Sequence, residues 1–321
     1  MDAPVWLLTD PAMDRHATHG HPERPERRPA AAAGVRDAAG GDLAEPAVIP
    51  AADDAIERIH GAAYVERVRE ADAAGGSWLD PDTYLVSGSL EAARLAVGAT
   101  LQAARAAATG EAEIAFAAVR PPGHHAAARR ASGFCLFNNV AVAAAELRAA
   151  GLAQRIAIVD WDVHHGDGTQ AIFDDDPDLC YASTHQWLLY PGTGDRHDRG
   201  VGPAEGTKHN VPLLPGKGDA AFVTAWRDEL LPAVEAFGPE AILVSAGYDG
   251  HHDDPLAHLE ITEDGYEQVA RLLGATAARL GLPGVTLALE GGYDLDALRR
   301  SVAATVRGLR HGRRSAHEVA R

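Results

Sequence analysis

The stretch "RIAIVDWDVHHGDGT", residues 155–169, decides how this chain folds. Its first residues are mostly branched and apolar, which is typical of a strand buried on both faces of a parallel sheet. Acids and histidines follow at once: Asp160, Asp162, His164, His165 and Asp167. Unpaired ionisable groups are too costly to bury in a packed core. The end of this strand therefore predicts a functional site, with a metal ion as the first candidate to hold its charges.

Similar apolar runs recur along the chain and alternate with Ala- and Leu-rich segments of helical spacing. Strands are predicted at 5–8, 113–119, 155–160, 179–184, 241–246 and 284–289. Helices are predicted at about 87–109, 137–150, 219–237, 262–280 and 294–309. This alternation favours an α/β fold with a mainly parallel sheet between two helical layers, a three-layer αβα arrangement. Without a repeat or a linker, residues 1–321 are read as one catalytic domain.

The composition limits the classes of function. With 46% hydrophobic and 23% charged residues, the 321-residue chain is ordinary for a globular protein. It has neither a transmembrane-length apolar run nor a signal peptide, so we expect a cytoplasmic protein. Cys135 and Cys180 are expected to be buried thiols in a reducing compartment. The net charge of −17 disfavours nucleic acid and anionic membranes. The basic tail 307–321 is expected to be the frayed end of the last helix.

Polar, glycine-bordered sequences follow several of the predicted strands. They are "RPPGHHAAARRASGFCLFNN" after 113–119, "DWDVHHGDG" after 155–159, "GYDGHHDDPLAHL" after 241–246 and "EGGYD" after 284–289. Active sites of open parallel sheets lie beyond the carboxyl ends of the strands. We therefore expect these loops to build one site.

A metal site is predicted at Asp162, His164 and Asp249. The i, i+2 spacing of the first two puts both side chains on one side of an extended backbone, and Asp249 follows another strand. Three protein ligands plus a water are the usual catalytic zinc arrangement. Two carboxylates and one imidazole are more oxygen-rich than most zinc sites, so Fe²⁺ competes. The alternative is that the aspartates are helix caps or turn residues.

Proton transfer is predicted at the pair His124 and His125. Two adjacent imidazoles can serve as general base and electrostatic partner of a metal-bound water, with Asp160 and Asp167 orienting them. Surface-loop histidines are the alternative. Tyr293, in "LEGGYD", can donate a hydrogen bond to a developing oxyanion. A tyrosine packed on a turn is the alternative there.

These motifs together resemble a known family. "RPPGHHA", "GFCLFNN", "DWDVHHGDGT", "YPGTGD", "SAGYD" with "DDPL", and "LEGGYD" are similar to the histone deacetylase and acetylpolyamine amidohydrolase superfamily. "HGHPERPERR" (19–28) and "WLDPDTYLVSGS" (78–89) resemble its bacterial, class II-like branch. The resemblance covers the chain from about residue 8 to 300.

The resemblance implies a zinc-dependent amidohydrolase on an arginase-like or deacetylase-like fold. Its substrates would be acyl-lysine side chains of peptides or proteins, or small acetylated amines. It implies zinc ligands at Asp162, His164 and Asp249. His125 would be the main general base and acid, oriented by Asp167. His124 would be its partner, held by Asp160, and Tyr293 would polarise the acyl oxygen.

The resemblance also implies a substrate tunnel. Phe134 and Tyr190 would form its walls, with tyrosine where phenylalanine is more usual, and Leu256 would overlook its mouth. Gly133, Gly291 and Gly292 would complete the substrate-binding set. Relatives specialised for polyamines can carry glutamate in place of Leu256, so the leucine favours acyl-lysine peptides or apolar-capped amides.

A structural potassium ion is implied as well, together with a second cation site near Phe173. The expected residues of the first site are Asp160, Asp162, His164, Ser183 and Thr184, which would contribute mostly backbone oxygens.

Other functions compete with this interpretation. An acetylpolyamine deacetylase is the closest alternative, and a two-manganese arginase or ureohydrolase shares the fold class. A module that binds acylated amines without hydrolysing them is a further one. Neither G-x-S-x-G nor H-E-x-x-H occurs, so serine hydrolases and zincins lack support. The oligomeric state stays open, a homo-oligomer included.

Overall fold

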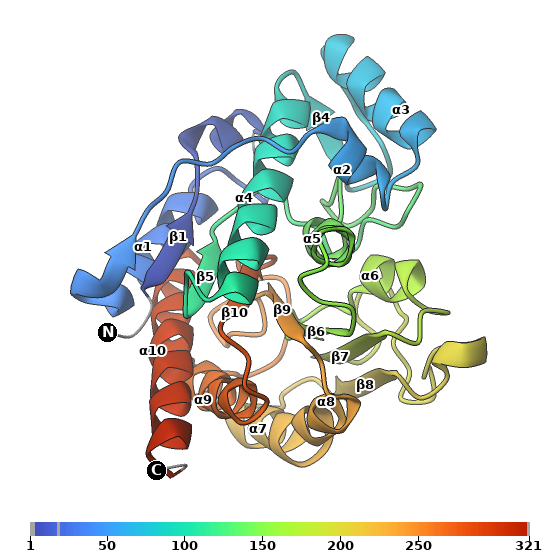
Figure 1. The fold of residues 1–321 in the computed structure, drawn as a ribbon. Helices are drawn as coiled ribbons and strands as arrows, with labels where there is room; N and C mark the ends of the chain where they lie inside the picture. The colour runs from blue at the N-terminus through green and yellow to red at the C-terminus, as the bar shows by residue number, and fades with distance from the viewer. Residues whose placement is uncertain (1–3, 18–19, 320–321) are drawn as a thin grey trace.

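The computed structural model describes residues 4–17 and 20–319 and has a parallel sheet at its centre (Figure 1). The eight strands follow the order β2-β1-β5-β10-β9-β6-β7-β8, and every neighbouring pair is parallel. They span Val5–Leu8 (β1), Leu43–Ala44 (β2), Ile114–Ala117 (β5), Ile156–Asp160 (β6), Leu179–Gln186 (β7), Lys208–Leu213 (β8), Ala241–Ala246 (β9) and Val285–Leu289 (β10). A separate antiparallel hairpin joins β3 (Gly76–Trp78) to β4 (Tyr84–Val86).

Helices cover both faces of the sheet. In Figure 1, α4 and α5 lie on one side and α1, α9 and α10 on the other, which confirms the three-layer αβα prediction. The α-helices span Arg27–Ala39 (α1), Asp53–Glu57 (α2), Ala62–Ala73 (α3), Ser89–Thr109 (α4), Asn139–Ala149 (α5), Asp167–Ile172 (α6), Asp219–Ala225 (α7), Leu231–Phe237 (α8), Glu263–Arg279 (α9) and Leu295–Val319 (α10). A π-helical turn, Trp226–Leu230, connects α7 to α8 within the segment predicted as one helix.

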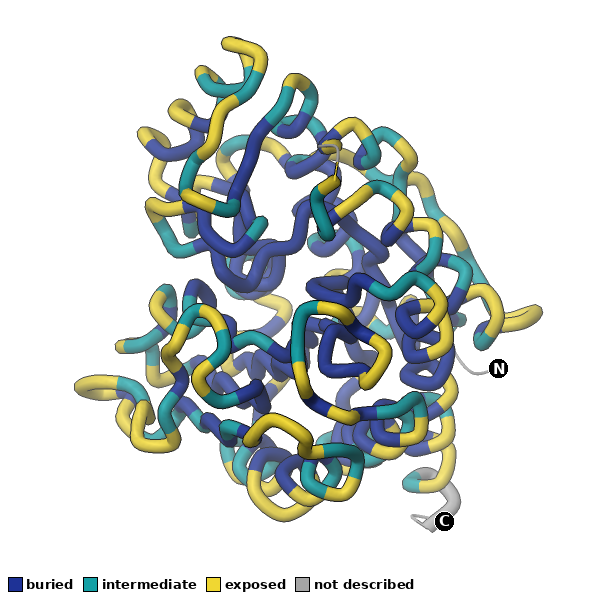
Figure 2. Tube along the Cα trace, turned by 180° about the vertical axis from the view of Figure 1, so that it is seen from behind, coloured by how far each residue is buried: buried dark blue, intermediate teal, exposed yellow. Residues whose placement is uncertain are grey.

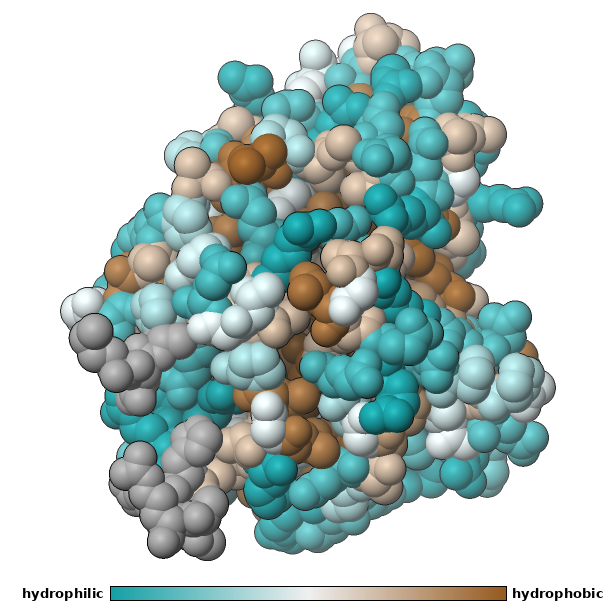
Figure 3. Space-filling view, in the orientation of Figure 1, coloured by the Kyte–Doolittle hydropathy of each residue, from teal (hydrophilic) through white to brown (hydrophobic). Residues whose placement is uncertain are grey.

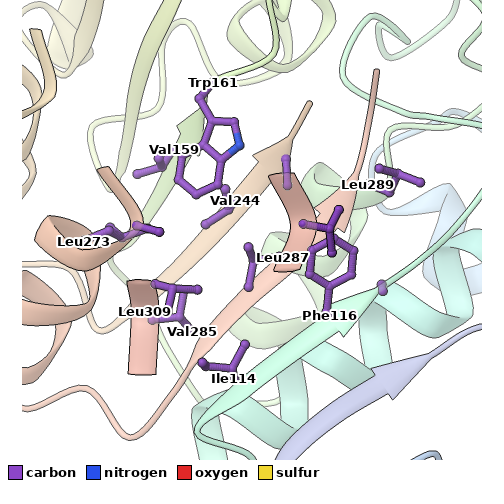
Figure 4. Packing of buried hydrophobic residues seen from close by; sticks show 14 of the residues in the cluster. Ile114, Phe116, Val159, Trp161, Val244, Leu273, Val285, Leu287, Leu289 and Leu309 are labelled. Atoms are coloured by element: carbon purple, nitrogen blue, oxygen red, sulfur yellow. The ribbon is translucent and has the colours of Figure 1, made fainter. Parts of the chain in front are cut away.

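The central strands are apolar throughout because neither face of the sheet meets water. Every residue of β5, β6, β7, β9 and β10 is buried. Figure 4 shows Phe116 and Leu287 packed within the sheet, and Leu273 of α9 and Leu309 of α10 closing over it. Two covered faces remove the apolar–polar alternation of a half-exposed strand.

Several elements were not predicted, among them β8 and helices α1, α2, α3 and α6. Strand β8, "KHNVPL", lies at the sheet edge, where a proline and polar residues are tolerated because one side of the strand needs no partner. Helix α1, "RRPAAAAGVRDAA", carries a proline in its first turn and little contrast between its faces.

The prediction of a frayed basic tail is wrong. Helix α10 continues to Val319, and Arg313 is buried in its last part. Its Nε donates to Glu113 Oε1 at 3.1 Å, and its Nη2 donates to the carbonyls of Leu282 and Pro283. Two of its three nitrogens find acceptors in this way, which lets the buried guanidinium pack against the domain. The tail is therefore helical as far as Val319 and packed against the domain at Arg313, and residues 320–321 lie outside the described part of the chain.

Buried and exposed residues are clearly separated in the fold. Figure 2 shows the buried segments gathered inside and the exposed ones along outer loops and helices. The face in Figure 3 is largely hydrophilic, with scattered apolar side chains. Both cysteines are buried and unpaired, as predicted. Among the described residues, no helix combines the length and apolar character needed to cross a membrane. His19, in a motif quoted above, lies outside the described residues.

Candidate active site

The loops after β5, β6, β9 and β10 meet because these strands are neighbours in the sheet, in the order β5-β10-β9-β6. Between them lies a cavity of about 140 Å³. Its walls combine predicted site residues with two others, Asp82 and Pro122. The predicted residues in its lining are His124, His125, Gly133, Phe134, His164, Tyr190, Leu256, Gly291 and Tyr293.

The three predicted metal ligands lie together, and one of them, His164, lines the cavity. Donor atoms of Asp162, His164 and Asp249 all fall within 4.8 Å of one another. His164 Nδ1 is 3.0 Å from Asp162 Oδ1 and 3.2 Å from Asp249 Oδ2. Both carboxylates are fully buried, and Asp249 Oδ2 accepts no well-directed hydrogen bond from the described residues. Two buried carboxylates, one of them with an unbonded oxygen, and an imidazole together fit a divalent cation.

The electrostatics of this group favour positive charge. Burial opposes protonation of His164, but Asp162 and Asp249 raise its pKa to about 10. Burial and the neighbouring Asp162 raise the pKa of Asp249 above its ordinary value. Each carboxylate is therefore stabilised by a cation placed between them.

A second group with metal-ligand chemistry, His251, His252 and Asp253, lies on the loop after β9. Its fit is poorer, since His252 and Asp253 are exposed and Arg300 Nη2 already pairs with Asp253 at 3.1 Å. An arginine supplies the positive charge that an ion would bring.

The adjacent histidines are each held by a different acid. His124 Nδ1 lies 3.1 Å from Asp160 Oδ2, and His125 Nδ1 lies 2.8 Å from Asp167 Oδ1. Their ring centroids are 4.1 Å apart. These are the orienting pairs that the sequence predicted.

The two histidines differ in protonation. Burial lowers the pKa of His124, but Asp162, Asp160 and Glu290 outweigh it and hold that pKa well above its ordinary value. For His125, burial and the neighbouring positive His124 lower the pKa to about 3, against the pull of Asp167. The neighbouring carboxylates thus favour the charged form of His124, whereas burial favours the neutral form of His125, and a base with an electrostatic partner needs this difference.

Glycines let the predicted site residues approach the backbone closely. Gly133 has φ +53°, and a Cβ there would lie 2.3 Å from His125 Cδ2. A Cβ on Gly291 would lie 2.0 Å from Asp249 Oδ2. Any side chain at either position would displace a site residue.

Aromatic side chains line the approach to the histidines. The Tyr190 ring stands at 86° to His125 with centroids 5.0 Å apart, and its hydroxyl lies 2.6 Å from Ser132 Oγ. Phe134 and Tyr293 meet edge to face with centroids 6.1 Å apart. Leu256 and Tyr293 also line a neighbouring cavity of about 740 Å³, which leads outward.

Tertiary structure adds residues that the sequence reasoning missed. Glu290 Oε2 accepts from Gly123 N at 2.6 Å and from His124 N at 3.1 Å, which fixes the histidine loop. Arg27 donates from Nε to Gly292 O at 2.5 Å and from Nη2 to Glu290 O, and its Cζ lies 4.7 Å from the Tyr293 ring centroid. An acid directly after an apolar strand was a usable signal for Glu290.

The residues predicted to surround a potassium ion adjoin the metal ligands, and their side chains are bonded within the protein. Asp160 Oδ2 accepts from Tyr181 Oη at 3.0 Å, Ser183 Oγ lies 3.0 Å from His185 Nδ1, and Thr184 Oγ1 accepts from Trp226 Nε1 at 3.1 Å.

The ammonium group of Lys208 binds the segment that follows Phe173, the residue near which a second cation was predicted. The Phe173 carbonyl accepts from Asp176 N at 3.0 Å. Lys208 Nζ donates to Asp176 O at 3.1 Å, Leu179 O at 2.8 Å and Thr207 Oγ1 at 2.7 Å.

Comparisons with known proteins identify relatives of this chain. A family model described as "Histone deacetylase domain" matches residues 21–309. A "Probable deacetylase" of Archaeoglobus fulgidus is 41% identical over 244 residues, 76% of this chain and 67% of that protein. A "Histone deacetylase-like amidohydrolase" of Pseudomonas aeruginosa is 39% identical over 246 residues, 76% of this chain and 65% of that protein. The chain thus spans about two thirds of either relative. A crystal structure of the HDA15 HD domain superposes with a TM-score of 0.90 at 36% identity, covering 96% of this chain and 90% of that one.

Proposed function

The chain belongs to the histone deacetylase family, and from that premise we propose that it is a zinc-dependent deacylase acting on acylated lysine side chains. Membership supports a hydrolase of the deacetylase or amidohydrolase type. The observation that carries the finer proposal is the buried Asp162, His164 and Asp249 group beside a neutral His125 paired with Asp167.

Zinc would be held by Asp162, His164 and Asp249, with Fe²⁺ as the competing ion. When bound, zinc supplies a Lewis acid and lowers the pKa of a water molecule to about 7. The open acceptor on Asp249 Oδ2 and the raised pKa of His164 support a cation there.

Proton transfer would be carried by His125. Its Nδ1 faces Asp167, so its Nε2 is left to accept a proton from the attacking water, and Asp167 then stabilises the imidazolium. His124, already cationic, would stabilise the negative charge that develops on the acyl oxygen. The departing amine would take its proton from this histidine pair.

Tyr293 would donate a hydrogen bond to the acyl oxygen. Burial, opposed by Arg27, holds its pKa well above the ordinary value, so the hydroxyl keeps its proton. One preorganised donor of this kind typically contributes about 10²–10³ in rate. Phe134 and Tyr190 would enclose the apolar stem of the acylated side chain.

Substrate choice would depend on the mouth of the cavity. Leu256 offers apolar contact and no charge, which supports acyl-lysine peptides or apolar-capped amides. Asp82 in the same lining supports the alternative, an acetylpolyamine deacetylase, because its carboxylate could attract a distal ammonium.

A substrate panel tests the proposal. The purified protein, loaded with Zn²⁺ or Fe²⁺, would be assayed on acetyl-lysine peptides, acetylspermidine, acetylputrescine and small amides. We expect the highest kcat/KM on acyl-lysine peptides. A kcat/KM well above this on acetylated polyamines would favour the alternative. Binding of acylated amines without turnover of any panel member would indicate a non-catalytic module.

A further inference from the structure

Asp254 joins two loops of the candidate site through one buried carboxylate. It is 6% exposed and lies between Asp249 and Leu256 in the loop after β9. Its Oδ1 accepts from Leu256 N at 3.1 Å. Its Oδ2 accepts from Tyr293 N at 2.6 Å and from Asp294 N at 3.3 Å. Three backbone N–H groups from two loops thus converge on a single side chain.

The residues held in this way stand where the two cavities meet. Leu256 and Tyr293 line both the inner cavity of about 140 Å³ and the outer one of about 740 Å³. The spacing of these two residues therefore sets the passage between the cavities. Tyr293 is also the proposed donor to the acyl oxygen.

We propose that Asp254 is a positioning residue that fixes Leu256 and Tyr293 relative to each other. Through one carboxylate, Asp254 sets both the direction of the Tyr293 hydroxyl and the width of the tunnel mouth between Tyr293 and Leu256. This role rests on the proposed deacylase function and deepens it, since Asp254 would tune both turnover and substrate selection at that site.

The contacts around Asp254 exceed those of an ordinary helix cap. Helix α10 is already capped by Asp294, whose Oδ1 accepts from Ala297 N at 2.8 Å. The shortest bond of Asp254 goes to Tyr293, which precedes the helix. On the N-terminal side of Tyr293, Arg27 donates a hydrogen bond to the carbonyl of Gly292, whose φ is +116°. The Tyr293 backbone is therefore clamped between an arginine and a carboxylate.

Kinetics of Asp254→Asn provide the main test, with Asp253→Asn as the matched control. Asp253 is the exposed neighbour, paired with Arg300 and outside both cavities. An amide keeps one acceptor oxygen and loses the other, so one of the loops is released. Small misplacements of catalytic groups can cost up to about 10² in rate. We expect kcat on an acetyl-lysine peptide to fall at least about tenfold in Asp254→Asn and to stay within about twofold in Asp253→Asn.

A double-mutant cycle distinguishes positioning from general damage. If Asp254 acts through Tyr293, then Asp254→Asn should lower kcat much less in the Tyr293→Phe background than in the wild type. The same fold-loss in both backgrounds, or metal loss in Asp254→Asn alone, would overturn the proposal. Should Asp254→Asn fail to fold, Asp254→Glu takes its place with the same expectation, because the longer side chain cannot hold all three N–H groups.

Hydrogen exchange supplies a readout that needs no turnover. Amides of segments 255–257 and 292–295 should exchange faster in Asp254→Asn than in the wild type or Asp253→Asn. Unchanged exchange of these amides in Asp254→Asn would overturn the positioning role of Asp254, even if the enzyme is active. An inactive wild type with lost protection in Asp254→Asn would instead overturn the proposed function and leave the clamp standing.

Discussion

Asp167 accepts from His125 Nδ1 at 2.8 Å through one carboxylate oxygen, while its other oxygen lies 3.4 Å from Arg130 Nη2. This carboxylate is three residues beyond the proposed ligand His164, at the start of α6. It holds the imidazole through Nδ1, so Nε2 of His125 stays available for the proposed proton transfer. In the proposed mechanism, the short segment 162–167 would supply both metal ligands and the acid that orients the base.

Replacing Asp167 by asparagine should lower kcat by about 10² or more, because the imidazole loses the acid that sets its tautomer and stabilises its cation. His125→Ala should be at least as damaging. Both are measured as kcat on an acetyl-lysine peptide. Arg130→Ala is the control: its guanidinium is 64% exposed, and such pairs contribute about 0–1 kcal/mol. A few-fold effect in Asp167→Asn would contradict its assigned role.

Replacing Asp249 by alanine should abolish both metal binding and activity, because it removes one of the three proposed protein ligands. The change also removes the buried oxygen Oδ2, which accepts no hydrogen bond from the described residues. Elemental analysis of the purified variant measures this directly. Asp253→Ala, in the same loop, should retain the metal. Full zinc occupancy in Asp249→Ala would show that the assignment is wrong.

Replacing Tyr293 by phenylalanine should keep the fold and the metal and reduce kcat by about 10²–10³. The edge-to-face contact with Phe134 survives the change, since only the hydroxyl is removed. Circular dichroism, metal content and kcat together measure this. Turnover within a few-fold of wild type would make Tyr293 a packing residue.

Replacing Leu256 by glutamate should shift the enzyme towards acetylated polyamines. A carboxylate at the cavity mouth would attract the distal ammonium, and a hydrogen bond to a charged group contributes about 1.5–3 kcal/mol. The measured quantity is the ratio of kcat/KM for acetylspermidine to that for an acetyl-lysine peptide. Leu256→Gln controls for polarity without charge. An unchanged ratio would remove Leu256 as the selecting residue.

Acid should destabilise the fold through Glu23. This buried carboxylate accepts from Arg120 Nη2 at 2.5 Å and from Arg27 Nη1 at 3.1 Å. Burial opposes ionisation, but Arg120 and Arg27 lower the pKa of Glu23 from 4.5 to about 2. A depressed carboxyl pKa stabilises the folded state above the unfolded pKa, and that stability is lost as the pH falls from 4.5 to about 2.

Urea unfolding across this range measures the effect. The wild type should lose a contribution on the order of 3 kcal/mol between pH 4.5 and 2 that Glu23→Gln lacks at every pH. Glu205→Gln, at an exposed position, should follow the wild type. Parallel pH profiles for the wild type and Glu23→Gln would contradict the assignment.

Much of the fold could be predicted from the chain alone, for a definite reason. A parallel sheet covered on both faces needs uninterrupted apolar strands, and segments such as "IAIV" and "AILV" have few other stable places. Strand β8 was not predicted because it lies at the sheet edge, where polar residues and proline are tolerated. Helix α1 was not predicted because its alanine-rich sequence does not separate into an apolar face and a polar face.

The site was predictable where its residues are close in sequence and not where they act across loops. Asp162 and His164 are two residues apart, so they lie close together in any backbone. The extended geometry expected for them is not found: residues 162–164 bend after β6, and Asp162 Oδ1 accepts from His164 N at 2.9 Å. Arg27 donates to Gly292 O, and Tyr293 N donates to the Asp254 carboxylate. Both hydrogen bonds join segments far apart in the chain, so no sequence periodicity predicts them.

The sequence by itself determined which chemical groups stand at the strand ends, because the apolar runs dictate a parallel sheet and the residues after them must lie at its carboxyl edge. Only the tertiary structure decided what each group does there. His124 and His125 are identical and adjacent, yet the pKa of one is raised and that of the other lowered. The physical reason is that a pKa depends on the charges that surround a buried ring, and those arrive from separate strands and loops.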